Sequence, residues 1–150
     1  MQTFQTVLRD QPEIAKVHVL LGQAYLVTGG NSLAKESFER AMTLHPGQID
    51  ASRSLAALES QSGRHRQARA RLDDLLKQRP DDVAALELLF NLDLVTKNWL
   101  EAEHKLNRLR AVSKDSVVAF MAEGRLRQAQ GQLDKASAAY ECATALLPND

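Results

Sequence analysis

The chain has 150 residues, the length of one ordinary domain, and 44% of them are hydrophobic, which is enough for a sizeable core. Lysine and arginine balance aspartate and glutamate at 19 each, so there is no net positive charge to neutralise phosphates, and nucleic-acid binding is not expected. The single cysteine, Cys142, excludes an intrachain disulfide. No apolar run approaches the roughly 20 residues of a membrane span, and no signal peptide is apparent, so the compartment stays open between cytoplasm and periplasm.

Apolar residues recur at i, i+3, i+4 and i+7 along the chain, the spacing of one buried face of an α-helix. Nine helices are expected. In chain order they span residues 2–10, 13–29, 31–44, 47–62, 65–78, 81–97, 99–112, 115–130 and 133–147. Glycine readily ends a helix in the left-handed region, and Gly29–Gly30, Gly63 and Gly131 mark three of the expected turns.

The four prolines share one frame of 34 residues. Pro12, Pro46 and Pro80 follow one another at this interval, Pro148 lies two periods beyond Pro80, and Lys114 holds the skipped slot. A fixed period of 20–50 residues indicates stacked repeats, and 34 is the period of a helix–turn–helix unit.

In this frame, residues 1–14 are the second helix of a truncated preceding repeat. Four full repeats follow at residues 15–48, 49–82, 83–116 and 117–150, the third being the most degenerate, and together they predict one continuous solenoid domain. Terminal repeats normally carry a polar outer face, and neither end shows one. We therefore expect a fragment of a longer array with apolar surface exposed at both ends, through which a homo-oligomer would form.

The first repeat carries a recognisable pattern. Positions 7, 8, 11, 20, 24, 27 and 32 hold Leu21, Gly22, Tyr25, Ala34, Phe38, Ala41 and Pro46. The pattern resembles the tetratricopeptide repeat (TPR) family, W-x2-L-G-x2-Y followed by A-x3-F, A and P, with His18 in place of the first aromatic residue. The resemblance implies an all-α, right-handed superhelical solenoid of antiparallel helix pairs. Small residues at positions 8 and 20 are expected to let the two helices of each pair approach closely.

The resemblance also implies a concave groove, lined by first-helix positions 2, 5, 9, 12 and 13, that receives a peptide or helix. In repeats 1 and 2 these are Lys16, Val19, Gln23, Leu26, Val27, Asp50, Arg53, Ala57, Ser60 and Gln61. In repeats 3 and 4 they are Ala84, Glu87, Asn91, Leu94, Val95, Val118, Met121, Arg125, Gln128 and Ala129. The carboxylate clamp of chaperone-binding members and the asparagine ladder of sugar-transferring members are both absent in this register.

The third repeat departs most from the pattern. Phe90 replaces the small residue at position 8, and an aromatic there should push the helix pair open. Asp93 takes the position-11 aromatic slot, and Arg127 takes it in the next repeat. Because stacking brings equivalent positions near one another, Asp93 is expected to pair with Arg127. Drift in a tolerant array is the alternative explanation.

No catalytic constellation, metal site or cofactor motif is predicted. The four histidines, at repeat positions 4, 31, 17 and 22, do not converge, and Cys142 occupies a solvent-side slot. The basic run at residues 64–71 is expected to be a solvated convex face, with an anion or nucleic-acid site as the alternative.

We expect a non-enzymatic module that binds a protein or peptide partner and does not insert into membranes. Two alternatives remain: a non-catalytic arm of a larger enzyme such as a transferase, or a self-assembling scaffold. The alanine-rich repeats are typical of bacterial envelope, secretion or exopolysaccharide systems.

Overall fold

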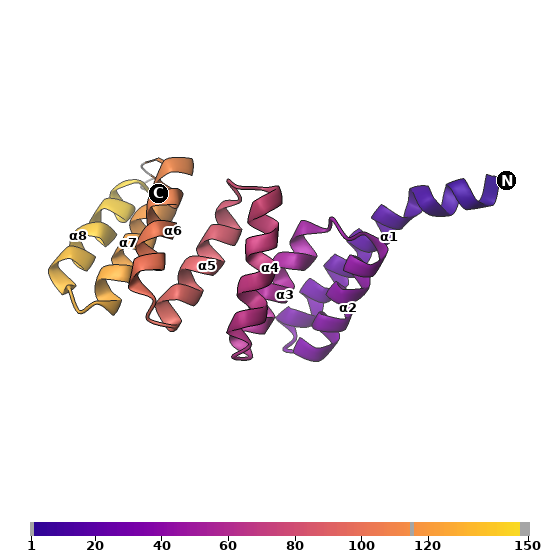
Figure 1. The fold of residues 1–150 in the computed structure, drawn as a ribbon, viewed down its shortest axis with the longest axis horizontal. Coiled ribbons are helices and arrows are strands. Elements are labelled where there is room, and N and C mark those ends of the chain that lie inside the picture. Colours follow the sequence, from indigo (N-terminus) through magenta and orange to yellow (C-terminus); the bar gives the residue numbers. More distant parts are fainter. Residues whose placement is uncertain (1, 115, 148–150) are drawn as a thin grey trace. The chain divides into compact units, whose positions relative to one another are not determined.

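The computed structural model describes residues 2–114 and 116–147, with side chains from residue 13 onward. Eight α-helices and no strand are found in the described residues (Figure 1). They are α1 (Gln2–Val27), α2 (Asn31–Leu44), α3 (Ile49–Gln61), α4 (His65–Gln78), α5 (Val83–Val95), α6 (Trp99–Val112), α7 (Val117–Ala129) and α8 (Leu133–Ala145). The prediction of an all-α fold built from helix pairs is confirmed.

The first two expected helices are a single helix, since α1 continues without a break through Pro12. This is why the described residues contain eight helices where nine were expected. A proline removes one helical hydrogen bond, but a stop also needs a residue that leaves the helix. Gly47 follows one in-frame proline, and Asp82, two residues after another, caps α5 by accepting a hydrogen bond from a backbone N–H. Pro12 is followed by Glu13 and Ile14, which favour neither turn nor cap.

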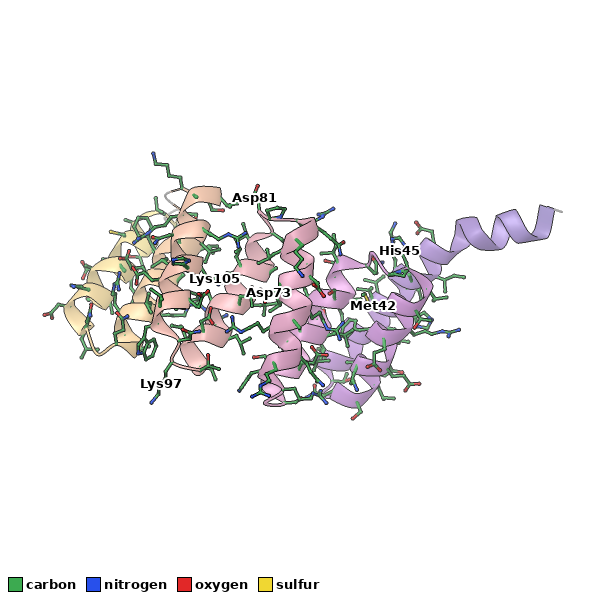
Figure 2. The ribbon with its side chains drawn as sticks, in the orientation of Figure 1. Met42, His45, Asp73, Asp81, Lys97 and Lys105 are labelled. Carbon is green, nitrogen blue, oxygen red and sulfur yellow. The ribbon has the colours of Figure 1, made fainter. Side chains whose placement is uncertain are left out.

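The first helix of each repeat ends in the same hydrogen-bonded turn. A residue with positive φ stands at the same place in each repeat: Gly29 (78°), Gly63 (74°), Lys97 (56°) and Gly131 (75°). The next residue donates its N–H to the carbonyl five residues back, at 2.8 Å in all four cases, which is the Schellman motif. Lys97 is the one non-glycine residue with positive φ in the described part of the chain, and Figure 2 shows it in the turn between α5 and α6.

The chain divides at Leu75, within α4, into two compact units. In unit 1, α2 packs against α1 and α3 around a buried cluster. This cluster consists of Val19, Ala34, Phe38, Ala41, Ala51, Leu55 and Leu58. In unit 2, α5 packs on α6, α6 on α7 and α7 on α8, and each of these helices contributes fully buried or nearly buried alanine, leucine or phenylalanine side chains.

Glycines at repeat position 8 allow close helix contact, as predicted. A Cβ atom on Gly22 would lie 2.6 Å from the ring of Phe38, and one on Gly124 would lie 2.3 Å from the ring of Tyr140. The close partner is thus the aromatic residue at position 24 of the same repeat. These two glycines make room for a ring that an added methyl group would displace.

Candidate functional site

The first-helix positions expected to line a groove remain accessible, with one exception. In unit 1, Val19 is only 6% exposed and belongs to the buried cluster, so its assignment to a binding surface is wrong. Its side chain is buried in a cluster with residues of α2 and α3. Leu26 is half-buried and packs against the same cluster. The remaining predicted residues of this unit are exposed or half-buried: Lys16, Gln23, Val27, Asp50, Arg53, Ala57, Ser60 and Gln61.

Two of the unit 1 candidates form ion pairs within their own helices. Lys16 Nζ lies 2.8 Å from Glu13 Oε1, one turn earlier on α1. Arg53 pairs with Asp50 one turn earlier on α3. Such exposed pairs within one helix contribute little to stability, and they leave both charges hydrated.

In unit 2, three predicted residues from two helices meet. Arg125 on α7 donates from Nη1 to Asn91 Oδ1 at 3.0 Å and from Nη2 to Glu87 Oε1 at 3.3 Å, both on α5. Arg125 and Asn91 are 34 residues apart, at the same position of neighbouring repeats. The stacking therefore brings equivalent first-helix positions together, as the resemblance implied.

A buried aromatic ring lies against the Arg125 guanidinium of this cluster. The guanidinium carbon of Arg125 lies 5.6 Å from the centroid of the Phe90 ring, within the range of a cation–π contact. Phe90 itself is fully buried. The ring and the two hydrogen bonds orient a guanidinium whose side chain remains 34% exposed.

Apolar side chains flank the cluster on the same helices. Met121, one turn before Arg125 on α7, is 41% exposed, and Val95 at the end of α5 is 66% exposed. Gln128, one turn after Arg125, accepts a hydrogen bond from the Tyr140 hydroxyl at 3.0 Å. The other predicted residues of this unit are half-buried or exposed: Ala84, Leu94, Val118 and Ala129. We call Glu87, Asn91, Met121 and Arg125 the α5–α7 surface.

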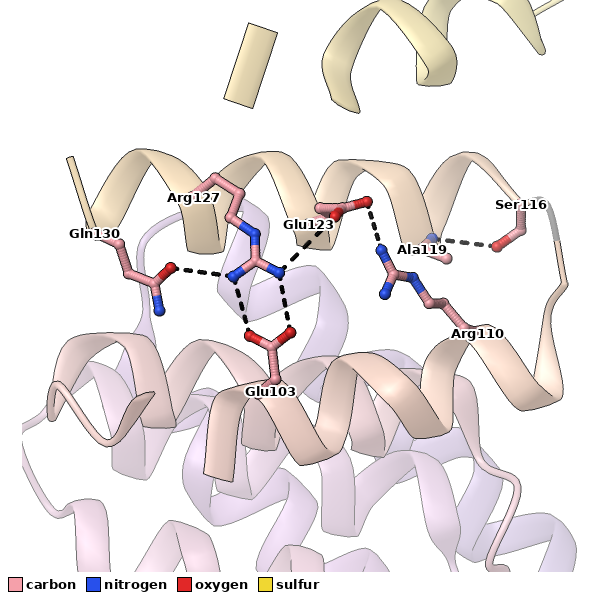
Figure 3. A network of polar contacts seen from close by, with 7 residues as sticks. All are labelled: Glu103, Arg110, Ser116, Ala119, Glu123, Arg127 and Gln130. Atoms are coloured by element: carbon pink, nitrogen blue, oxygen red, sulfur yellow. Dashed lines mark hydrogen bonds and ion pairs between the residues drawn. The ribbon is translucent and has the colours of Figure 1, made fainter. Parts of the chain in front are cut away.

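The expected pair between Asp93 and Arg127 is wrong. Arg127 forms a two-pronged ion pair with Glu103 on α6, at 2.9 and 3.1 Å, and also donates to Gln130 (Figure 3). Arg127 also lies 3.9 Å from Glu123, which in turn pairs with Arg110. The Arg127 side chain reaches Glu103 on the second helix of the preceding repeat and forms no pair with Asp93 on the first.

Position 11 holds a carboxylate in the second and third repeats, and each carboxylate lies near a basic side chain of its own repeat. Glu59, 7% exposed, accepts hydrogen bonds from Arg71 at 2.8 and 3.2 Å. The fully buried Asp93 has the Lys105 ammonium 3.9 Å from its Oδ2. The acid stands at position 11 and the base twelve residues later at position 23, so the charge pattern follows the 34-residue period.

Other candidate chemistry finds no support in the described residues. No group of three or more histidine, cysteine, aspartate or glutamate side chains is arranged there to hold a metal ion. Cys142 is a free, exposed thiol, as expected. Arg64 and Arg66 of the basic run are exposed, while Arg71 is engaged by Glu59. None of the described helices combines the length and hydropathy of a membrane span.

Comparison with known proteins agrees with the repeat register. Residues 31–92 match the tetratricopeptide repeat family. They run from the start of α2 into α5 and contain one Schellman turn and the in-frame prolines Pro46 and Pro80. Residues 31–92 therefore form a TPR segment of this chain. Its fold is similar to the crystal structure of TTC0263, a thermophilic TPR protein in Thermus thermophilus, with a TM-score of 0.79 at 20% identity over 88% of this chain and 74% of that one.

Two curated human proteins are also similar in sequence. Superkiller complex protein 3 is 34% identical over 83 residues, covering 55% of this chain. Protein O-mannosyl-transferase TMTC1 is 25% identical over 153 aligned residues, covering 99% of this chain. The TPR chain spans only 5% and 17% of the lengths of these two relatives.

Sequence reasoning missed two features of this TPR chain. It treated Phe90 only as an obstacle to helix packing, whereas the ring also supports Arg125. It also missed the acid–base pairs at positions 11 and 23. Their signal was present in the sequence: the acids Glu59 and Asp93 are 34 residues apart, and so are the bases Arg71 and Lys105.

Proposed function

We propose that this TPR chain is a protein-binding module that holds a peptide or helix of its partner on the first-helix side, centred on the α5–α7 surface. TPR repeats generally mediate protein–protein interactions, and the resemblance to this family implies that the contact residues are on the first helices. The observation that carries the proposal is the meeting of Glu87, Asn91 and Arg125.

The chemistry of this surface suits a polar chain with an apolar anchor. The Arg125–Glu87 contact of 3.3 Å is longer than the roughly 2.7–2.9 Å of a strong charge-assisted bond, and both side chains are about one-third exposed. A partner carboxylate or backbone carbonyl can therefore displace Glu87 at low cost. Met121 offers apolar contact area beside it, where an apolar side chain of a bound helix can anchor.

Site-specific photo-crosslinking in cells tests this proposal. A photoreactive phenylalanine analogue replaces Met121, and a matched control carries it at Leu100, which is 73% exposed on α6. We expect a discrete protein adduct from position 121 only, and we expect Arg125→Ala to weaken that adduct at least several-fold. Equal adducts from both positions, or an adduct that Arg125→Ala leaves unchanged, would contradict binding at the α5–α7 surface.

A second candidate function is favoured by the similarity to TMTC1, which extends over nearly the whole chain. In that case the repeats serve as a non-catalytic arm that presents a protein substrate to a transferase domain elsewhere in a longer polypeptide. The α5–α7 surface would then bind the substrate. A full-length protein without any catalytic domain would contradict this alternative.

A further inference from the structure

The ion pair between Glu87 and Arg125 leaves both charges incompletely satisfied. Arg125 meets Glu87 through one contact of 3.3 Å, from Nη2 to Oε1. Arg127, two residues further along α7, donates to both carboxylate oxygens of Glu103, at 2.9 and 3.1 Å. A two-pronged contact is the stronger arrangement of a guanidinium and a carboxylate. The Glu87–Arg125 pair is therefore the weaker of these two pairs.

The surroundings of Arg125 restrict how a ligand can reach it. Its Nε is buried and has no hydrogen-bond partner in the described part of the chain. The buried Phe90 ring lies 5.6 Å from the guanidinium carbon. Nη1 and Nη2 make the contacts to Asn91 and Glu87. A ligand therefore reaches the guanidinium at Nη1 and Nη2, and a two-pronged ligand competes with Glu87 there.

A ligand that displaces Glu87 releases a second charge. The Glu87 side chain is 33% exposed and the Arg125 side chain 34%, so neither charge is fully hydrated. A neutral backbone carbonyl would leave both charges without a counter-charge. A ligand with only a carboxylate would satisfy Arg125 but place a second anion beside the released Glu87, and uncompensated or like charges at an interface are costly. Charge balance is restored when the ligand also brings a cation to Glu87.

We propose that the partner segment on the α5–α7 surface is a helix with an acidic and a basic side chain one turn apart, which exchange partners with Glu87 and Arg125. This inference rests on the proposed binding function. The partner's acid binds Nη1 and Nη2 of Arg125, and its base binds the Glu87 carboxylate. Because Glu87 and Arg125 are in contact, the acid and the base must also be neighbours, as side chains one helical turn apart are. An apolar side chain of the same helix packs on Met121, which is 41% exposed.

The variant Glu87→Gln tests the exchange, in the 150-residue chain with the photoreactive residue at position 121. If the partner's base pairs with Glu87, the variant should lower the adduct yield about three- to fivefold, the effect of losing one partly exposed ion pair. If Glu87 only competes for Arg125, the variant should raise the yield. The control Glu39→Gln removes the same charge from an exposed pair with Lys35 on α2 and should leave the yield unchanged. Thermal unfolding followed by circular dichroism checks that each variant is folded.

Mass spectrometry of the adduct locates the crosslinked segment of the partner. The double variant Glu87→Arg/Arg125→Glu should lose the adduct, and interchanging the acid and the base of that segment should restore it. An adduct that Glu87→Gln strengthens or leaves unchanged would retain the binding function and overturn the charge exchange. A crosslinked segment without an acid and a base one turn apart would overturn it too. The absence of any adduct from position 121 would refute the binding function itself, and this inference with it.

Discussion

Replacing Gly22 by alanine tests the packing of the first helix pair. The new Cβ would lie 2.6, 2.8 and 2.8 Å from three ring carbons of Phe38, whereas carbon atoms pack best at about 3.5–4.0 Å. Phe38 is fully buried, so its ring cannot swing toward solvent. Overpacking costs about 1–3 kcal/mol, and contacts this short are in the upper part of that range, at about 2–3 kcal/mol. The better helix propensity of alanine offsets about 1 kcal/mol of this cost.

We therefore expect Gly22→Ala to lower the free energy of unfolding by about 1–2 kcal/mol, which for a chain of this size lowers the Tm by roughly 2–8 °C. Urea titration followed by circular dichroism at 222 nm measures the change. Gly124→Ala should cost less than Gly22→Ala although its clash distance is 2.3 Å, because Tyr140 is only half-buried and its ring can swing toward solvent.

The second repeat supplies a matched rescue. Its Ala56 and Leu72 occupy the positions of Gly22 and Phe38, and both are buried. The double variant Gly22→Ala/Phe38→Leu should thus lose about 1 kcal/mol less unfolding free energy than the two single variants lose together. This difference is within the range of couplings between contacting residues. A Gly22→Ala chain as stable as the unaltered one, or single effects that simply add, would refute the steric argument.

Two further substitutions have calculable effects. Lys97→Gly should raise the free energy of unfolding by about 0.5–1 kcal/mol. A φ of 56° costs a lysine about 1–2 kcal/mol, and the larger entropy that glycine loses on folding offsets part of the gain from removing this strain. A loss of stability in urea titration would contradict this. Arg127→Met should cost about 1 kcal/mol, since its pair with Glu103 is partly buried, and the difference from the unaltered chain should shrink in 1 M NaCl. The control Lys35→Met removes an exposed pair with Glu39 and should change stability by less than about 0.5 kcal/mol.

Much of the fold followed from periodicity because each repeat solves the same local problem. A residue with positive φ recurs in all four repeats. A glycine opposite an aromatic ring recurs in the first and fourth repeats, and the in-frame proline is missing only from the third. The exception was α1, where the in-frame Pro12 predicted a break. A proline is only one part of the stop signal, and the partners present after the other prolines, a glycine or a capping aspartate, are missing there.

The site was less predictable because side-chain reach decides it. Arg125 and Asn91 hold the same position of neighbouring repeats, and helix stacking alone brings them together. Arg127 stands only two residues away, yet it turns to Glu103 on the second helix of the preceding repeat instead of Asp93 on the first. Residues two apart on a helix do not share a face, so equivalent positions in neighbouring repeats meet on one side of the first helix but not on the other.

Arg125 and Arg127 connect α7 to different helices of the preceding repeat. Arg125 contacts α5 through a long, partly solvated pair with Glu87, and Arg127 holds α6 through a two-pronged pair with Glu103 (Figure 3). A partner that displaces Glu87 from Arg125 therefore leaves the Arg127–Glu103 contact in place. The loose pair is on the side where we propose that a ligand binds, and the tight pair maintains the packing of the helices that present it.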